Sequence, residues 1–168
     1  MKSGLIPGFV YHCEILDRHG KVVDRFKEHN IIPIQGMNRI ASLLLGGGAT
    51  PTASWYLGLL NTGFTVNEDS TLQGATAYEN TTYTTTGNAR LDWDYVYDNE
   101  YSITNVVSRA EFDFVNAATI YGAFLTDLAT RSTYATGCLL SVANFSSPRS
   151  IDAGGTLRVT AGITLGTT

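Results

Sequence analysis

The sequence predicts a mostly β protein, either a sandwich of two antiparallel sheets or a closed barrel. Residues 156–165 alternate strictly between apolar and polar or small side chains. Eight or nine segments of strand length are separated by turn-forming residues, and a single segment has helical periodicity. Many short strands with turns between them are typical of sandwiches and barrels.

The alternation near the C-terminus is the clearest strand pattern. Its apolar face carries Leu157, Val159, Ala161, Ile163 and Leu165. Because successive side chains of a strand point to opposite faces, this pattern predicts a sheet with one buried and one solvated face.

The chain opens with a predicted hairpin, followed by the only predicted helix. Residues 9–16 alternate, residues 17–20 form a turn, and residues 21–27 return as a second strand. At residues 36–45 the apolar positions Met37, Ile40, Ala41 and Leu44 have helical spacing, and three glycines end the helix. A helix of about ten residues is marginal alone, so we expect it to lie on the sheet or close one end of it.

The middle of the chain divides into a strand and a long irregular segment. Residues 53–60 form an apolar run of strand length, consistent with a central strand. Residues 61–88 have few aliphatic side chains and many threonines, which predicts an extended loop or arm with at most short edge strands. So long a segment without periodicity is usually functional.

Strand patterns resume after the threonine-rich segment. The predicted strands are residues 89–97, 101–107, 109–114, 119–126 and 137–145, with a loop at residues 128–136. No internal repeat is present, and 168 residues fit one domain, with residues 1–8 as a possible N-terminal arm.

The composition favours a protein-binding or plain β domain over a nucleic-acid binder. Charged residues make up 15% of the chain, against about 25% in ordinary soluble proteins. The net charge is −4 and the basic residues are scattered, so the basic stripe of a nucleic-acid binder is missing. Its N-terminal segment does not resemble a signal peptide, and no apolar run reaches the ~20 residues of a membrane span, so we expect synthesis and retention in a cytosol.

The cysteines and histidines do not form a recognisable site. Cys13 and Cys138 lie in separate apolar segments and are predicted to be reduced core thiols, although a disulfide stays open. The spacing of His12, His19 and His29 fits no standard zinc pattern, so we predict surface polar residues and no metal.

We find no catalytic motif, and two clusters between residues 92 and 100 have competing interpretations. The sequence contains neither a nucleophile elbow nor a zinc-protease helix. Four acids could bind calcium or form a glycosidase pair, although a solvent-facing strand explains them better: Asp92, Asp94, Asp98 and Glu100. The aromatic residues Trp93, Tyr95 and Tyr97 are either core or a stacking platform for sugars or bases.

Several segments resemble a known family. They are residues 30–40 (NIIPIQGMNRI), 54–60 (SWYLGLL), 119–124 (TIYGAF), 139–149 (LLSVANFSSPR) and 152–162 (DAGGTLRVTAG). Together they are similar to the capsid decoration, or cement, proteins of tailed bacteriophages, over most of the chain from residue 30. The resemblance implies a jelly-roll-like antiparallel β-sandwich of about eight strands with one short α-helix.

The resemblance also implies a function. We expect a non-enzymatic virion structural protein, made in the host cytoplasm, that binds the outer surface of a phage capsid and bridges subunits of the major capsid protein. It would act as a homodimer, or alternatively a homotrimer, without a cofactor. Residues 1–8 and 61–88 are expected to be ordered mainly by partners, with capsid or subunit contacts at Leu5, Phe64, Tyr78 and Tyr83. The alternative is a carbohydrate-binding or structural module of a phage tail or fibre, which an exposed aromatic platform would favour.

Overall fold

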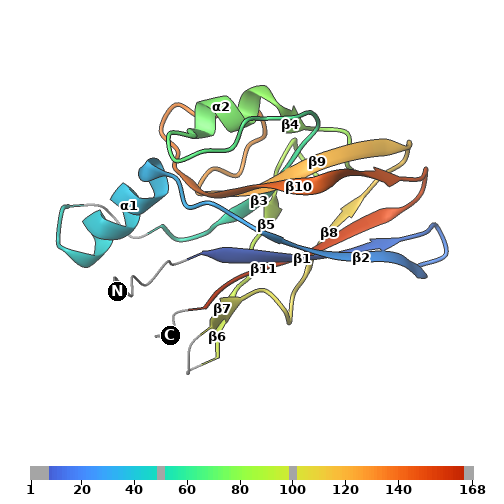
Figure 1. The fold of residues 1–168 in the computed structure, drawn as a ribbon, viewed down its shortest axis with the longest axis horizontal. Coiled ribbons are helices and arrows are strands. Elements are labelled where there is room, and N and C mark those ends of the chain that lie inside the picture. Colours follow the sequence, from blue (N-terminus) through green and yellow to red (C-terminus); the bar gives the residue numbers. More distant parts are fainter. Residues whose placement is uncertain (1–7, 49–51, 99–101, 165–168) are drawn as a thin grey trace.

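Two antiparallel sheets and two helices make up the described part of the chain (Figure 1). The structure is a computed structural model, and it describes residues 8–48, 52–98 and 102–164. One sheet has six strands and the other has five, so the mostly β prediction is confirmed.

The six-stranded sheet joins the two ends of the described chain. Its strand order is β2 (Val22–His29), β1 (Phe9–Leu16), β11 (Thr156–Thr164), β7 (Ser102–Thr104) and β6 (Val96–Tyr97), and β8 (Ala110–Asp113) also pairs with β11. The predicted opening hairpin is therefore present, with a left-handed Gly20 in its turn (φ 76°). Pairing of β1 with β11 sets Cys13 opposite Val159.

An asparagine side chain bonds to β11 in the gap between the part of β11 that pairs with β7 and the part that pairs with β8. Asn105 is fully buried, and its Oδ1 accepts a hydrogen bond from the Ala161 amide at 2.7 Å. Its Nδ2 donates to the Val159 carbonyl at 3.2 Å. The side chain thus satisfies ladder groups of β11 that no strand pairs, which removes the cost of burying them unpaired.

The five-stranded sheet is covered on both faces. Its order is β10 (Leu139–Ile151), β9 (Ala118–Thr126), β3 (Tyr56–Leu60) and β4 (Glu79–Asn80), and β5 (Leu91–Asp92) also pairs with β3. Helix α2 (Leu72–Ala77) lies over its outer face (Figure 1) and packs Leu72 and Ala75 against Phe124. Burial on both faces explains the nearly continuous apolar sequence of β3.

The inner faces of the two sheets share one hydrophobic core. Fully buried side chains come from the six-stranded sheet (Tyr11, Phe112, Leu157) and from the five-stranded sheet (Leu57, Leu125). The apolar face predicted for the last strand is confirmed as far as Ile163, and Leu165 lies outside the described residues.

A charged seam closes one side of the molecule, where β2 and β10 approach each other. The Arg149 guanidinium lies 3.2 Å from the Asp24 carboxylate, 3.9 Å from that of Glu28, and 4.2 Å from the Phe26 ring centroid. The Ser146 amide donates to Glu28 at 2.8 Å. These bonds tie together two edges that would otherwise be open to strand addition.

Helix α1 (Ile34–Leu44) contacts β10 at its first turn and then projects beyond the end of the sheets (Figure 1). A Cβ on Gly36 would lie 2.6 Å from the Leu140 carbonyl oxygen, so glycine permits this close contact. The predicted apolar stripe is mostly uncovered, since Met37 and Leu44 are exposed and Ile40 is only partly buried. Of the two expected placements, on the sheet or at one end of it, the second describes α1 better, because its first turn contacts β10 while most of its apolar stripe stays uncovered.

Two further predictions need correction. The described residues form eleven strands and two helices, against about eight strands and one helix expected, because α2 lies in the segment predicted as a loop. The single strand predicted at 89–97 is instead two short strands, since the chain leaves the five-stranded sheet after β5 and joins the other sheet at β6. The side chain of Trp93 enters the core at this crossing.

Candidate functional site

Two of the predicted contact residues lie together on the outside of the five-stranded sheet. The rings of Phe64 and Tyr78 have centroids 5.6 Å apart. Phe64 is half-buried against the residues under α2, and Tyr78 is 41% exposed. Leu5, the third predicted contact, lies outside the described residues. Phe64 and Tyr78 therefore form a small aromatic surface next to α2.

Tyr83, the fourth predicted contact, is not on the surface. It is 2% exposed, and its ring makes edge contacts with Phe112 at 4.8 Å and Phe114 at 6.4 Å between centroids. The Arg131 guanidinium lies over the same ring at 4.6 Å from its centroid. A partner cannot reach this side chain, because the core of the same chain surrounds it.

A buried ion pair anchors the threonine-rich segment. The Arg90 Nε and Nη2 donate to the two carboxylate oxygens of Glu79 at 2.7 and 2.9 Å, and both side chains are fully buried. The Ser132 amide donates to Glu79 at 2.7 Å, and the Arg90 Nη1 donates to the Leu128 carbonyl at 2.7 Å. The network links β4 to the predicted loop 128–136, and the sequence patterns did not reveal it.

The end of the molecule at α1 exposes large apolar side chains. Leu44 is 78% exposed and Leu45 is 84% exposed, and three more α1 side chains are at least one-third exposed: Ile34, Met37 and Leu43. We call these five residues the α1 surface. An apolar groove of about 350 Å³ lies beside it, between the helix and residues that include Trp55, Tyr95 and Ile103.

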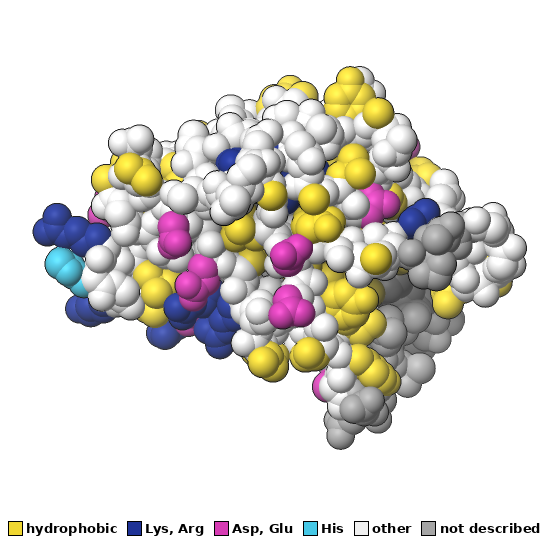
Figure 2. Space-filling model, turned by 180° about the vertical axis from the view of Figure 1, so that it is seen from behind, with side chains coloured by type: hydrophobic (Ala, Val, Ile, Leu, Met, Phe, Trp, Pro, Cys, Tyr) yellow, Lys and Arg dark blue, Asp and Glu magenta, His cyan; other side chains and the backbone are white. Residues whose placement is uncertain are grey.

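On the rear face of the molecule, the hydrophobic side chains and most of the basic side chains lie in different places. Figure 2 shows hydrophobic side chains across the middle of this face and toward the end with undescribed residues, whereas Lys and Arg gather mainly at the opposite end. Acidic side chains lie between the hydrophobic ones. Backbone and other uncharged side chains cover most of this face, with hydrophobic and acidic side chains scattered across its middle.

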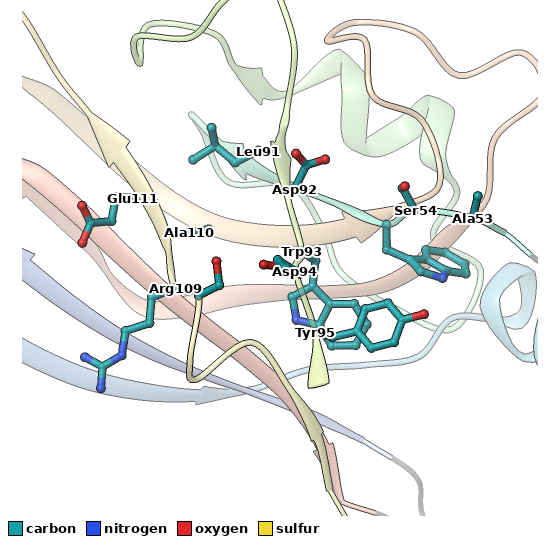
Figure 3. A pocket seen from close by; sticks show the side chains of 12 residues that line it. Ala53, Ser54, Leu91, Asp92, Trp93, Asp94, Tyr95, Arg109, Ala110 and Glu111 are labelled. Carbon is teal, nitrogen blue, oxygen red and sulfur yellow. The ribbon is translucent and has the colours of Figure 1, made fainter. Parts of the chain in front are cut away.

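A hollow of about 710 Å³ lies where the chain crosses between the sheets (Figure 3). Three segments line it: residues 53–55 before β3, residues 91–95 at the crossing, and residues 108–111 at the start of β8. It occupies the side of the molecule where β5 and β8 approach each other. The sequence could not predict this meeting, because it depends on the crossing after β5.

The predicted aromatic platform is divided between core and surface. Trp93 is 5% exposed, and its Nε1 donates to the Ala161 carbonyl at 2.9 Å. Tyr95 stacks on Trp93 at 4.7 Å with an interplanar angle of 29°, and it is 43% exposed. Tyr97 is exposed on β6 but does not line the hollow. The hollow therefore presents one substantially exposed aromatic ring, that of Tyr95.

Of the four acids noted in the sequence, two line the hollow. Asp92 and Asp94 are exposed, line the hollow, and have no ion pair or side-chain hydrogen bond within the described residues. In Figure 3 the Arg109 and Glu111 side chains point away from Tyr95. Each has a partner outside the hollow, since Arg109 pairs with Glu14 at 3.1 Å and Glu111 with Arg158 at 2.7 Å.

The remaining acids and the histidines lie elsewhere. Asp98 is not among the residues that line the hollow, and Glu100 lies outside the described residues. His12, His19 and His29 are all exposed. Among residues 8–48, 52–98 and 102–164, no group of three or more His, Cys, Asp or Glu is arranged to hold a metal ion.

Both cysteines are free and buried, which confirms the prediction of reduced core thiols. Burial raises the pKa of both the Cys13 and Cys138 thiols to about 12. Thiols held in the protonated form are poor nucleophiles, so neither residue has the environment of a reactive cysteine.

Comparisons with models of known protein families and with curated proteins found no match. Within the described part of the chain, no helix is both long enough and apolar enough to cross a bilayer. The case for a function therefore depends on the surfaces described above.

Proposed function

We propose that this chain is a non-enzymatic structural protein of a tailed-phage virion, a jelly-roll-like sandwich that binds the outer surface of the capsid and bridges capsid subunits. The observation that supports it is the α1 surface, where Leu44 and Leu45 are 78% and 84% exposed. Large contiguous patches of exposed apolar side chains are rare on monomeric proteins, and where they occur they mark sites of protein–protein interaction. The partner would be the major capsid protein, met after synthesis in the host cytoplasm.

The physical basis of the proposal is burial of this surface at repeated capsid junctions. Burying a leucine side chain contributes about 1.5–3 kcal/mol. A protein that bridges several subunits converts each later contact into an intramolecular one, so modest contacts combine into firm attachment. A low content of charged residues, 15% here, reduces the cost of removing such a surface from water.

Sedimentation of purified protein with phage heads that lack it tests the proposal. We expect the wild-type chain to sediment with the heads and Leu44→Glu to bind at least about tenfold more weakly, since 1.4 kcal/mol corresponds to a tenfold change. Val23→Glu is the matched control, because Val23 is also exposed (60%) but lies on β2. Equal loss in both variants, or no binding by the wild type, would contradict the proposal.

Self-association through a second surface is part of the same proposal. A homodimer, with a homotrimer as the alternative, would present two or three α1 surfaces to neighbouring capsid subunits. Light scattering on the purified chain, of 18.2 kDa, distinguishes a monomer from a dimer or trimer. A monomer at all concentrations would remove the bridging argument while leaving capsid binding open to the sedimentation test.

A second function, a carbohydrate-binding module of a phage tail or fibre, is favoured by a different surface. The half-exposed Tyr95 and the exposed Asp92 and Asp94 line the same hollow, although in Figure 3 the two carboxylates point away from the Tyr95 ring. Exposed aromatic rings next to hydrogen-bonding groups suit ligands that have both an apolar and a polar side. Tyr95 also lines the apolar groove beside the α1 surface, whereas Asp92 and Asp94 line the hollow and not the groove, so variants of the two acids test the second function separately from head binding.

A further inference from the structure

A second pocket, of about 610 Å³, lies on the outer face of the six-stranded sheet. Its volume falls within the range of about 300–1,000 Å³ typical of ligand sites. Three arginines line it, and we call it the arginine pocket: Arg25 on β2, Arg109 just before β8, and Arg158 on β11. It shares no lining residue with the groove beside the α1 surface, so the two are separate sites.

The register of the sheet brings the three guanidinium groups to one point. Glu14 lies opposite Arg25 on one side and opposite Arg158 on the other, and paired residues of antiparallel strands share a face. The Glu14 carboxylate accepts hydrogen bonds from Arg25 at 2.8 Å, from Arg109 at 3.1 Å and from Arg158 at 3.2 Å. A carboxylate of the chain itself therefore already marks the place where the three cations meet.

Two of these arginines keep most of their donors for a ligand. A guanidinium group has five N–H donors, and Arg25 and Arg109 each give one hydrogen bond to Glu14 within the described residues. Their side chains are 69% and 40% exposed. Arg158 differs, because it also donates to Glu111 at 2.7 Å and is only 25% exposed. Arg25 and Arg109 are therefore the two groups that a ligand can reach.

The charges of the pocket favour an anion. Three guanidinium groups face two lining carboxylates, those of Glu14 and Asp98, which leaves an excess of one positive charge. Lys27 adds another beside the pocket, since it lies opposite the lining residue His12. The hydrogen bond from Arg25 is the main reason that the pKa of Glu14 lies below its usual range. The pocket therefore stabilises a negative charge that is placed in it.

The charge of the whole chain narrows this anion to a short acidic segment. A net charge of −4 repels a long polyanion, whereas charges more than about 8 Å away are screened at physiological salt, so a short segment responds mainly to the pocket. Carboxylates fit the planar fork of arginine, as the bonds of Arg158 to Glu111 illustrate. Thr104 and Thr160 also line the pocket and offer hydroxyl groups to a peptide backbone.

We propose that the arginine pocket binds an acidic segment of a partner protein, whose Asp or Glu carboxylates accept hydrogen bonds from Arg25 and Arg109. This goes beyond the proposed capsid role and does not rest on it, because the pocket and the α1 surface have no residue in common. Glu14 is the internal counterpart of the incoming carboxylate and competes with it for the same donors.

Fluorescence anisotropy of dye-labelled hexaglutamate, titrated with the full chain, tests the proposal. Hexaglutamine with the same dye is the uncharged control, and unlabelled tripolyphosphate is a competitor that represents phosphate ligands. Hexaglutamate should bind at least about tenfold more tightly than hexaglutamine. Unlabelled hexaglutamate should displace the probe at a lower concentration than tripolyphosphate does.

A pair of double variants separates the pocket from the overall charge. Arg25→Ala, Arg109→Ala should weaken binding of hexaglutamate at least about tenfold. Arg18→Ala, Lys21→Ala removes the same charge from exposed residues of the β1–β2 turn, outside the pocket, and should weaken binding less than about threefold, because those charges are screened.

Glu14→Gln gives a test that misfolding cannot imitate, since it predicts a gain. Removing the competing carboxylate should tighten binding of hexaglutamate at least about threefold. Asp69→Asn, which removes one negative charge from an exposed loop away from the pocket, should leave binding unchanged.

Three results would overturn the proposal. Failure of hexaglutamate to bind, or equal loss in the two double variants, would remove the pocket as a site. Unchanged or weaker binding by Glu14→Gln would contradict competition for the arginine donors. Displacement of the probe by less tripolyphosphate than unlabelled hexaglutamate would contradict an acidic peptide as the ligand. Sedimentation with phage heads is measured independently, so none of these results decides the capsid role.

Discussion

Replacing Glu79 by glutamine should destabilise the fold strongly, because it leaves the buried Arg90 charge uncompensated. Both side chains are fully buried, and the carboxylate accepts two hydrogen bonds from Arg90 and one from the Ser132 amide. An amide in its place has one acceptor oxygen and turns an NH₂ group toward these donors. Removing one partner of a buried ion pair costs about 3–5 kcal/mol. The whole fold is worth only about 5–15 kcal/mol, so this is a large fraction of its stability.

Urea denaturation followed by tryptophan fluorescence measures this effect. With a denaturant dependence of about 2–3 kcal/mol/M, the loss corresponds to a fall of about 1–2.5 M in the urea midpoint. Glu111→Gln is the matched control, because Glu111 pairs with Arg158 at the same 2.7 Å but its side chain is 50% exposed. An exposed pair of this kind contributes about 0–1 kcal/mol.

The comparison of the two variants decides the argument. If Glu79→Gln lowers the midpoint no more than Glu111→Gln does, the reasoning that burial makes the first pair critical is refuted. A full effect would mean that the segment around β4 is held by its own chain, which weakens the expectation that residues 61–88 are ordered mainly by partners. Hydrogen exchange on the free and the assembled protein addresses that expectation directly, since equal protection in both states would contradict it.

Three further predictions follow from the core. In the folded chain at pH 8, Cys13 and Cys138 should not react with Ellman's reagent on the timescale on which both react in 6 M guanidinium; rapid reaction of either thiol would contradict its burial. Because burial raises both thiol pKa values from 9.0 to about 12, the folded state holds these protons more tightly than the unfolded state. Their contribution to the free energy of unfolding is complete below pH 9 and is lost as the pH rises toward 12, so urea midpoints should fall above pH 9; a midpoint that stays flat to pH 11 would contradict the sign. Gly58→Ala would set a Cβ 2.3 Å from the buried Phe124 ring and should cost about 1–3 kcal/mol, whereas Gly63→Ala, with no atom within 4 Å, should have little effect; equal midpoints would show that the core yields without cost.

Strand alternation predicted most of the sheets, because each buried face imposes a period of two. The hairpin of β1 and β2 and the apolar face of β11 were evident from the sequence for this reason. The strand predicted at 89–97 was wrong because alternation says which side chains share a face and not which sheet the chain joins. Trp93 keeps its inward position while the backbone passes from one sheet to the other.

The missed elements had weak local signals. Helix α2 is six residues long, and its pattern reduces to the pair Leu72 and Ala75, too short for periodicity to register. The Glu79–Arg90 pair joins residues eleven apart with no regular spacing. The threonine-rich composition around them suggested a loop, and it concealed the buried anchor.

The candidate site was only partly predictable. Asp92, Asp94 and Tyr95 were noted from the sequence, because acids and aromatic residues alternate there. Their meeting with residues 53–55 and 108–111 depends on tertiary packing, and the burial of Trp93 could not be told from its alternation. The exposure of the α1 surface was likewise hidden, since an apolar helical stripe ordinarily predicts burial.

The most direct test of the proposed capsid role is electron cryo-microscopy of heads with and without this chain bound. We expect additional density on the outer shell, fitted by the two sheets, with Leu44 and Leu45 turned toward the capsid and the β1–β2 turn toward solvent. Density that places the α1 surface in solvent, or heads that look the same with and without the protein, would contradict the account.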